Sequence, residues 1–391
     1  MNALKKSRSR FPLQRTRFAA LLLACAGGVQ AGGGIADDWL SSTHSCAGFN
    51  RTDAIHRDSD GTLWVGCGSN TGGYGVHFSQ DGGDTWSVPP LSVPDELDDF
   101  RVNSISRGAD GHLKIGGTEA GSMRMVLSLD TSGASYPVTL ELEGVNQIGR
   151  LFPVGNYREL SDGSGMAEQS TGTGALFSDG SAGTSAANWD DAGTPEQILD
   201  LVVHDDKFWG SGSRIAASPR LFLPPTNVAA EPWELLMVEP NLPEDWEGEL
   251  WGIAVNDQRL VAAGVNQDGT SSTGKILVSS ANPYDMNGYT EHDVSDILGI
   301  SSPYTWADGV CMRGDTIVVV GRRGNNDGFV VMSTNGAQSF FDATPSDAPG
   351  HVSKCLIEPD GTVVVAGEAS YIGILPADPV IFAAGFEEDP L

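Results

Sequence analysis

A short pattern recurs along the chain, in which a polar turn is followed by an apolar strand that ends in glycine. Successive copies start 50, 95, 52, 57 and 46 residues apart, and the longest interval predicts one further, degenerate copy at 147–154. A repeat of about 50 residues indicates one supersecondary unit used several times around a shared core. The recognisable copies start at Asp60, Asp110, Asp205, Asp257, Gly314 and Asp360.

Each copy contains the same order of short apolar runs. One run precedes the turn, the glycine-ended run follows it, and two more come after a variable loop. The runs alternate with a period of two, as in strands, and we find no amphipathic helix of 12 residues or more. Four short antiparallel strands at this spacing are typical of a propeller blade.

We therefore predict an all-β fold, a single seven-bladed β-propeller over 35–380 with four-stranded antiparallel blades. Strand sharing between 35–42 and the last blade is expected to close the ring. The 50 glycines, which do not follow a collagen period, fit a chain with many turns. The expected blades are 46–92, 98–141, 145–192, 197–238, 248–296, 304–345 and 351–380.

One turn has a recognisable side-chain pattern. Residues 79–86 fit Ser-x-Asp-x-Gly-x-Thr-Trp, and 333–340 form a weaker copy at the same phase of the repeat. The Asp side chain is expected to bind turn amides, the glycine to adopt a positive φ, and the Trp to pack on the blade. The residues expected to build these turns are Ser79, Asp81, Gly83, Thr85 and Trp86, with Ser333, Asn335, Gly336 and Phe340 in the second copy.

This pattern resembles the Asp box of the BNR, or sialidase-like, β-propellers, a superfamily that includes sialidases, xyloglucanases, sortilin-type receptors and photosystem assembly factors. The resemblance implies that these turns are structural and lie on the face away from a ligand site. The catalytic pattern of sialidases is not matched, since 149–153 only echoes their first arginine motif. Tyr304 and Glu249 occupy suitable blades without a supporting motif, so no catalytic residue is assigned.

The first 31 residues are typical of a secretory signal. Six basic residues precede an apolar run at 18–26, and a small-x-small cleavage pattern ends at Ala31. The alternative is a lipoprotein anchored at Cys25, because 22–25 resembles a lipobox. No other stretch approaches the length of a membrane span. We expect export to the periplasm or the extracellular space. Residues 380–387 resemble the short Ile-Phe-Ala-x-Gly-Phe-Glu tail found on many secreted gammaproteobacterial proteins, and 381–391 is assigned to a C-terminal tail; the alternative is that 380–384 forms a strand of the last blade.

Four cysteines follow the predicted signal, namely Cys46, Cys67, Cys311 and Cys355. Export permits disulfides, and the pairs close in sequence are Cys46 with Cys67 and Cys311 with Cys355, although three connectivities stay open. No Cys/His spacing indicates a metal site. No cofactor is predicted, although the acidic loops offer oxygen ligands to calcium.

Ligands of propellers usually meet the loops at one end of the central channel, here called the loop face. These loops join second to third strands and lead into each first strand. Aromatic residues there suit stacking on sugar rings, and arginines suit carboxylates, while blade packing and surface ion pairs are the alternative roles. The ligand-binding candidates are Arg101, Arg150, Trp246, Trp251, Tyr304, Trp306, Arg322 and Arg323.

The net charge of −28 argues against a nucleic-acid partner, because phosphates would be repelled. No HExxH, GxSxG, P-loop or dinucleotide-binding motif occurs. We predict a secreted, monomeric propeller that binds a protein or glycan through its loop face. The alternative is a sialidase-like glycosidase or polysaccharide lyase at the channel mouth, for which acidic pairs such as Asp98/Asp99 and Glu244/Asp245 are weak candidates. The sequence leaves catalysis and the identity of the ligand undecided.

Overall fold

The chain divides into two compact units, Met1–Gly33 and Gly34–Leu391, and every residue that can be described lies in the second. The predicted signal, Cys25, Cys46 and the tail at 381–391 therefore lie outside the described residues. The structure, a computed structural model, describes 38–377 except for 45–50, 70–71, 93–99, 109, 120–123, 144–147, 155–156, 163–174, 179–189, 192–196, 206, 215–217, 225–235, 239, 241, 243–245, 269, 285–287, 302–303 and 325–326.

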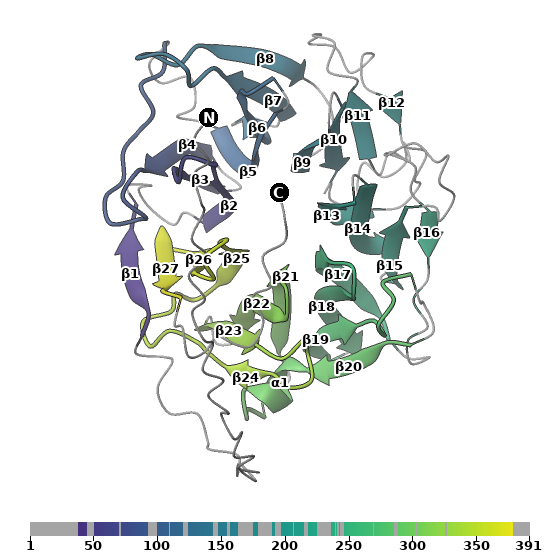
Figure 1. The fold of residues 1–391 in the computed structure, drawn as a ribbon. Helices are drawn as coiled ribbons and strands as arrows, with labels where there is room; N and C mark the ends of the chain where they lie inside the picture. Colours follow the sequence, from purple (N-terminus) through teal and green to yellow (C-terminus); the bar gives the residue numbers. More distant parts are fainter. Residues whose placement is uncertain are drawn as a thin grey trace, which may run out of the picture. The chain divides into compact units, whose positions relative to one another are not determined.

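The second unit is a β-propeller whose sheets are antiparallel meanders, each running outward from a first strand (Figure 1). The first strands are β2 (Arg51–Arg57), β5 (Phe100–Arg107), β9 (Ile148–Val154), β13 (Gln197–His204), β17 (Gly248–Val255), β21 (Thr305–Arg313) and β25 (Val352–Ile357). The second strands are β3 (Leu63–Ser69), β6 (Leu113–Glu119), β10 (Tyr157–Asp162), β14 (Lys207–Arg214), β18 (Leu260–Asp268), β22 (Thr316–Arg323) and β26 (Val363–Gly367).

The outer strands complete the meanders. The third strands are β4 (Gly72–Ser79), β7 (Arg124–Leu129), β11 (Ala175–Ser178), β15 (Ser218–Leu223), β19 (Ser271–Val278), β23 (Asp327–Ser333) and β27 (Tyr371–Leu375). The fourth strands are β8 (Val138–Glu143), β12 (Asp190–Asp191), β16 (Leu236–Val238), β20 (Thr290–Asp293), β24 (Phe341–Asp342) and β1 (Leu40–Thr43). A single helical turn, α1 (Val294–Ile297), follows β20.

The predicted set of seven four-stranded blades is wrong, because among the described residues six sheets have four strands and the sheet β2-β3-β4 has three. After β4 the chain turns back beside this strand, but the described residues form only an isolated antiparallel bridge between Phe78 and Ser87 instead of a fourth strand. Pro89 and Pro90 follow, and proline has no N–H with which to continue a ladder. The chain then pairs with the next sheet instead, where Ser92 N donates to Tyr136 O at 2.9 Å.

The sheets neighbour one another through their first strands. In order around the ring, the contacts join β2, β5, β9, β13, β17, β21 and β25, and β25 also contacts β2 (Figure 1). Alternate residues of a strand therefore pack on opposite neighbours. In β22, Val318 and Val320 pack in one core cluster while Ile317 and Val319 pack in another. The second strands read as continuous apolar runs because both faces are buried.

The N-terminal strand closes the ring. β1 pairs antiparallel with β27, from Leu40 opposite Ile374 to Thr43 opposite Tyr371, so that it supplies the fourth strand of the last sheet. This is the strand sharing expected from the sequence. Trp39 Nε1 donates to Ala343 O at 2.9 Å, and Trp86 Nε1 donates to Ser42 Oγ at 3.3 Å, so both ends of the strand are held from neighbouring sheets.

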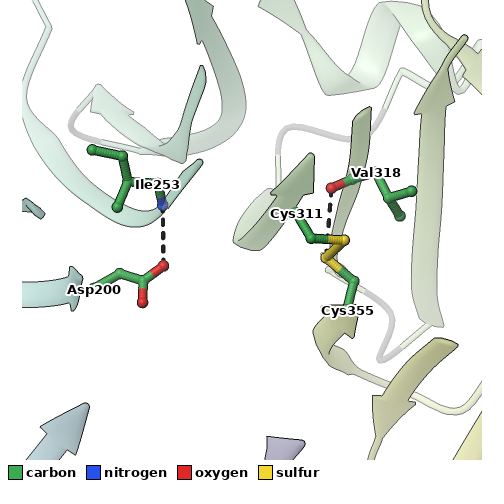
Figure 2. The surroundings of a disulfide bond; sticks show 5 residues. All are labelled: Asp200, Ile253, Cys311, Val318 and Cys355. Carbon is green, nitrogen blue, oxygen red and sulfur yellow. Dashed lines mark hydrogen bonds between the residues drawn. A yellow bond between two sulfur atoms is a disulfide. The ribbon is translucent and has the colours of Figure 1, made fainter. Parts of the chain in front are cut away.

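Neighbouring first strands are also linked directly (Figure 2). Cys311 in β21 and Cys355 in β25 form a disulfide with a Cα–Cα distance of 5.9 Å, one of the pairings that the sequence left open. Asp200 in β13 accepts a hydrogen bond from Ile253 N in β17 at 3.1 Å. The pairing of Cys46 with Cys67 stays a prediction, because Cys46 lies outside the described residues.

The two Asp-box-like turns have the same hydrogen bonds. In the first, Ser79 Oγ accepts from Gly83 N at 2.8 Å and Asp81 Oδ1 accepts from Thr85 N at 2.8 Å. In the second, Ser333 Oγ accepts from Ala337 N at 3.0 Å and Asn335 Oδ1 accepts from Ser339 N at 3.1 Å. Each serine and its Asp or Asn partner thus satisfy amides of a tight turn, which is a structural role.

The repeated glycine of the sequence has a specific packing reason. Six first strands contain a β-bulge against the second strand, at the end where the first strand begins. The bulge brings a first-strand carbonyl close to the second-strand glycine. A Cβ on Gly321 would lie 1.9 Å from Trp306 O, and one on Gly264 would lie 2.1 Å from Glu249 O. Equivalent contacts below 3.0 Å occur at Gly117 and Gly367. Glycine is needed at these positions because the backbones touch.

We expect Gly321→Ala to lower the free energy of unfolding by roughly 2–3 kcal/mol, because the added methyl group must displace backbone rather than a flexible side chain. Gly133→Ala is the matched control, since its Cβ would meet nothing closer than 3.4 Å. Chemical denaturation of the two variants measures the difference. Equal stabilities would show that the bulge yields easily to a side chain at this position.

We expect the ring closure to weaken in acid because of His44, which is buried directly after β1. Burial and, secondarily, the neighbouring His77 lower the pKa of His44 to about 3 from an ordinary 6.5. Between these two pKa values His44 binds a proton in the unfolded chain but not in the folded chain. The free energy of unfolding therefore falls as the pH falls below 6.5. The decrease in the free energy of unfolding due to His44 should reach about 2 kcal/mol by pH 5. Urea denaturation of His44→Gln against the parent, from pH 7 to pH 5, measures it, and parallel pH profiles would contradict it.

Candidate ligand-binding site on the loop face

The two ends of the propeller use their charged residues differently. The loop face lies where first strands begin and second strands end, and the turn face at the opposite end holds the Asp-Gly turns and Asp-box-like turns. Turn-face arginines link adjacent sheets. Arg107 Nε donates to Asp58 Oδ1 at 2.9 Å, Arg57 pairs with Glu358, and Arg259 pairs with Asp315 at 3.1 Å. These arginines serve the fold, which leaves the loop face as the place to seek a ligand site.

Two arginines share one carboxylate on the loop face. Asp53 is the extra residue of the bulge in β2, and its side chain is 5% exposed. Arg51 Nε donates to its Oδ1, and Arg101 Nη2 donates to its Oδ2 at 2.9 Å. Burial alone would raise the pKa of Asp53, but the charges of and hydrogen bonds from the two arginines outweigh it and hold the pKa below the usual value. Asp53 is therefore an ionised anchor for both guanidinium groups.

A second buried carboxylate lies in the equivalent bulge of β21. Asp308 Oδ2 lies 2.8 Å from His351 Nε2 and 3.9 Å from Arg322 Nε. The two clusters are electrostatically connected. Burial disfavours the charge of Arg51, but Asp53, Asp308 and Glu368 together raise its pKa. The charged groups of the first and last two sheets thus form one network around the seam where the ring closes.

An aromatic and guanidinium stack borders this network. Tyr304 and Trp306 lie nearly parallel, with ring centroids 6.2 Å apart and an interplanar angle of 16°. The guanidinium carbon of Arg322 lies 4.8 Å from the centroid of the Trp306 ring. Tyr304 is 43% exposed and the Arg322 side chain is 45% exposed. We call these three residues the stack. It presents a ring and a cation to solvent side by side.

The hydroxyl of Tyr304 is engaged, since it donates to Thr270 O at 2.9 Å. Glu249, the carboxylate considered beside it, accepts from Ser213 Oγ at 3.3 Å. Burial raises the pKa of Glu249, and this hydrogen bond offsets part of the effect. No contact joins Tyr304 to Glu249 in the described part of the chain. The structure therefore gives no geometric support to a tyrosine nucleophile assisted by Glu249.

The remaining candidates differ in position. Trp246 is a core residue whose Nε1 donates to Val265 O at 3.1 Å, which is the blade-packing role that the sequence left as the alternative. Trp251 is half-buried at the bulge of β17, and Arg323 is half-buried at the end of β22. Arg150 lies in β9, but its side chain is outside the description. The acidic pairs at 98–99 and 244–245 also lie outside the described residues.

The sequence reading missed four members of the network, which are Arg51, Asp53, Asp308 and His351. The sequence held one weak indication of these residues. All four lie at or next to the start of a first strand, at the position in the repeat where the bulge occurs. Among the residues that the structure describes, no group of three His, Cys, Asp or Glu side chains is placed to hold a metal ion. No helix in that part of the chain has the length and apolar character needed to cross a membrane.

We expect Asp53→Asn to lower the free energy of unfolding by about 3 kcal/mol, because it leaves Arg51 and Arg101 without their shared anion. The effect should shrink in acid, since Asp53 stabilises the fold fully above the pKa of its unfolded form and loses this contribution as the pH falls towards its lowered folded-state pKa. Denaturation at pH 7 and pH 3 tests both statements. Asp84→Asn, at an exposed turn residue, is the control. A neutral effect of Asp53→Asn at pH 7 would rule out the anchoring role.

Comparison with known proteins bears on the fold alone. No family model and no curated protein match the chain. Among solved structures, YCF48 bound to D1 peptide is similar at a TM-score of 0.56 and 15% identity, over 88% of this chain and 98% of that one. The extracellular domain of the putative hybrid two component system BT4673 from B. thetaiotaomicron matches at 0.58 and 9%, over 86% of this chain but 40% of its own. The WD40 beta propeller domain of Doa1 matches at 0.52 and 12%, over 88% and 99%. These similarities agree with a β-propeller.

Proposed function

We propose that the protein is an exported, non-enzymatic β-propeller that binds a polypeptide segment through its loop face. The observation that carries this proposal is the stack of Tyr304, Trp306 and Arg322, in which an exposed ring and an exposed guanidinium lie together at the end of one sheet. Exposed aromatic and arginine side chains are the residues most enriched at protein-binding hot spots.

Two further observations support a binding role. The solved structure of YCF48 is described as bound to a D1 peptide, so this fold can present a peptide site. Of the carboxylates beside the stack, Asp53 accepts from two arginines, and Asp308 Oδ2 lies 2.8 Å from His351 Nε2. A glycosidase needs two carboxyl groups that act on a bound sugar, one of them protonated. The network around Asp53 instead favours the ionised form, which fits binding better than hydrolysis.

Export is supported by chemistry as well as by the basic and apolar N-terminal sequence. The disulfide between Cys311 and Cys355 is a bond that persists in oxidising compartments. The acidic character of the chain, at a net charge of −28, suits a well-solvated surface.

Panning a phage library of random dodecapeptides on the immobilised full chain tests the binding role. We expect peptides to be enriched, and Trp306→Ala to weaken their binding at least roughly tenfold, as hot-spot truncations do. Val88→Ala is the control, because Val88 is also an exposed apolar residue but follows the turn-face end of β4.

A glycan array carried out with the same variants separates the alternatives. A sugar ring would also stack on Trp306, so glycan binding in place of peptide binding, lost in Trp306→Ala, would overturn the polypeptide proposal. Peptides bound equally well by the parent and by Trp306→Ala would show that the stack is not the site.

A further inference from the structure

We infer that Arg51 and Arg322 together bind a carboxylate of the partner segment, so that the loop face selects acidic peptides. This inference rests on the proposed function and specifies its ligand. It adds a residue, Arg51, that belongs to a different sheet from the stack. The two arginines come from the first and the sixth sheet along the chain, on either side of the last one.

Arg51 is held from one side only. Its Nε donates to Asp53 Oδ1, while its two terminal nitrogens have no hydrogen-bond partner among the described residues. The side chain is 40% exposed. Because the bond to Asp53 fixes the base of the guanidinium, the terminal N–H groups are oriented without being used. This is the arrangement that a bidentate carboxylate requires.

Arg322 has a similar arrangement with different support. Its guanidinium lies over the Trp306 ring, and its Nε is 3.9 Å from Asp308 Oδ2, beyond hydrogen-bonding distance. The structure gives the Arg322 guanidinium no hydrogen-bond acceptor within the described part of the chain. Stacking on the indole limits the rotamers of the side chain, so less conformational entropy is lost when a ligand binds.

Asp308 connects the two arginines. Its Oδ2 lies 3.9 Å from Arg322 Nε and 2.8 Å from His351 Nε2. His351 Nδ1 lies 4.0 Å from Glu368, whose backbone pairs with that of Arg51, so contacts lead from one arginine to the other. The side chains of Asp53 and Asp308 are 5% and 14% exposed, and their oxygens face arginine or histidine nitrogens. The two arginines of the proposed site are more exposed than these acceptors, at 40% for Arg51 and 45% for Arg322. Glu368, at 48% exposure beside His351, is more exposed than either aspartate.

A partner must supply acceptors to such a surface. A basic segment would be attracted by the net charge of −28 but would meet guanidinium donors here. An Asp or Glu side chain matches the fork geometry of arginine, and a neighbouring apolar or aromatic residue can cover Tyr304 and Trp306. The structure thus points to an extended segment with at least one carboxylate next to an apolar residue.

The random dodecapeptides displayed on phage supply the probe. We expect the enriched sequences to contain more Asp and Glu than the unselected library. The best sequence is then synthesised twice, once as selected and once with each Asp and Glu replaced by Asn and Gln. The amide version should bind the parent protein roughly tenfold to a hundredfold more weakly, as expected for the loss of charge-assisted hydrogen bonds.

The variants identify the residues. Arg51→Ala and Arg322→Ala should each weaken binding of the acidic peptide about tenfold and leave the amide version nearly unchanged, as in a double-mutant cycle. Arg51→Lys keeps the charge that pairs with Asp53 but loses the fork, so it separates recognition from folding. Arg313→Ala, at the turn-face end of β21, is the matched control. Thermal denaturation of each variant checks that the fold is intact.

Two other results are decisive in different ways. The first result is that the acidic and amide peptides bind equally, or that both arginine variants bind like the parent while Trp306→Ala binds more weakly. Either finding would show that the carboxylate site is wrong, and the polypeptide-binding proposal would stand. If the parent enriches no peptide at all, the proposed function itself fails, and the carboxylate site fails with it.

Discussion

The close approach of a second-strand glycine to a first-strand carbonyl is the contact on which the rest of the structure depends. At Gly264 and Gly321 there is no space for a side chain, because the bulge in the first strand pushes its backbone against the neighbouring strand. A bulge adds one residue and redirects the side chains beside it. The same local distortion therefore explains the repeated glycine, bends the start of each bulged first strand and places Asp53 and Asp308 on the loop face.

The ring is held by connections between sheets rather than by any one sheet. A sheet of four short strands buries apolar residues on both faces only if it has a neighbour on each side. The core clusters accordingly combine strands of adjacent sheets. The last gap is closed by β1, which supplies the outer strand of the sheet that contains β27. The charged network around Asp53 lies where the first and last sheets meet, so the candidate site depends on closure.

Within this frame the charged residues divide by face. Turn-face arginines such as Arg107 and Arg259 connect adjacent sheets, and each donates to more than one acceptor. On the loop face, Arg51 and Arg322 are supported from one side, and their side chains are 40% and 45% exposed. The same residue type therefore stabilises one face of the propeller and is available for recognition on the other, although the overall charge of the chain is strongly negative.

The sequence by itself determined the repeat, the antiparallel strands, the Asp-box-like turns and the face on which to look. These are local consequences of period-two patterning and of glycine, serine and aspartate at fixed spacing. The sequence also singled out Tyr304, Trp306 and Arg322. Only the tertiary structure decided that Trp246 is core, that Pro89 and Pro90 leave one sheet with three strands, and that Arg51, Asp53, Asp308 and His351 form one network. Those outcomes depend on contacts between residues 19 to 48 positions apart that lie in different strands or sheets, which no local pattern encodes.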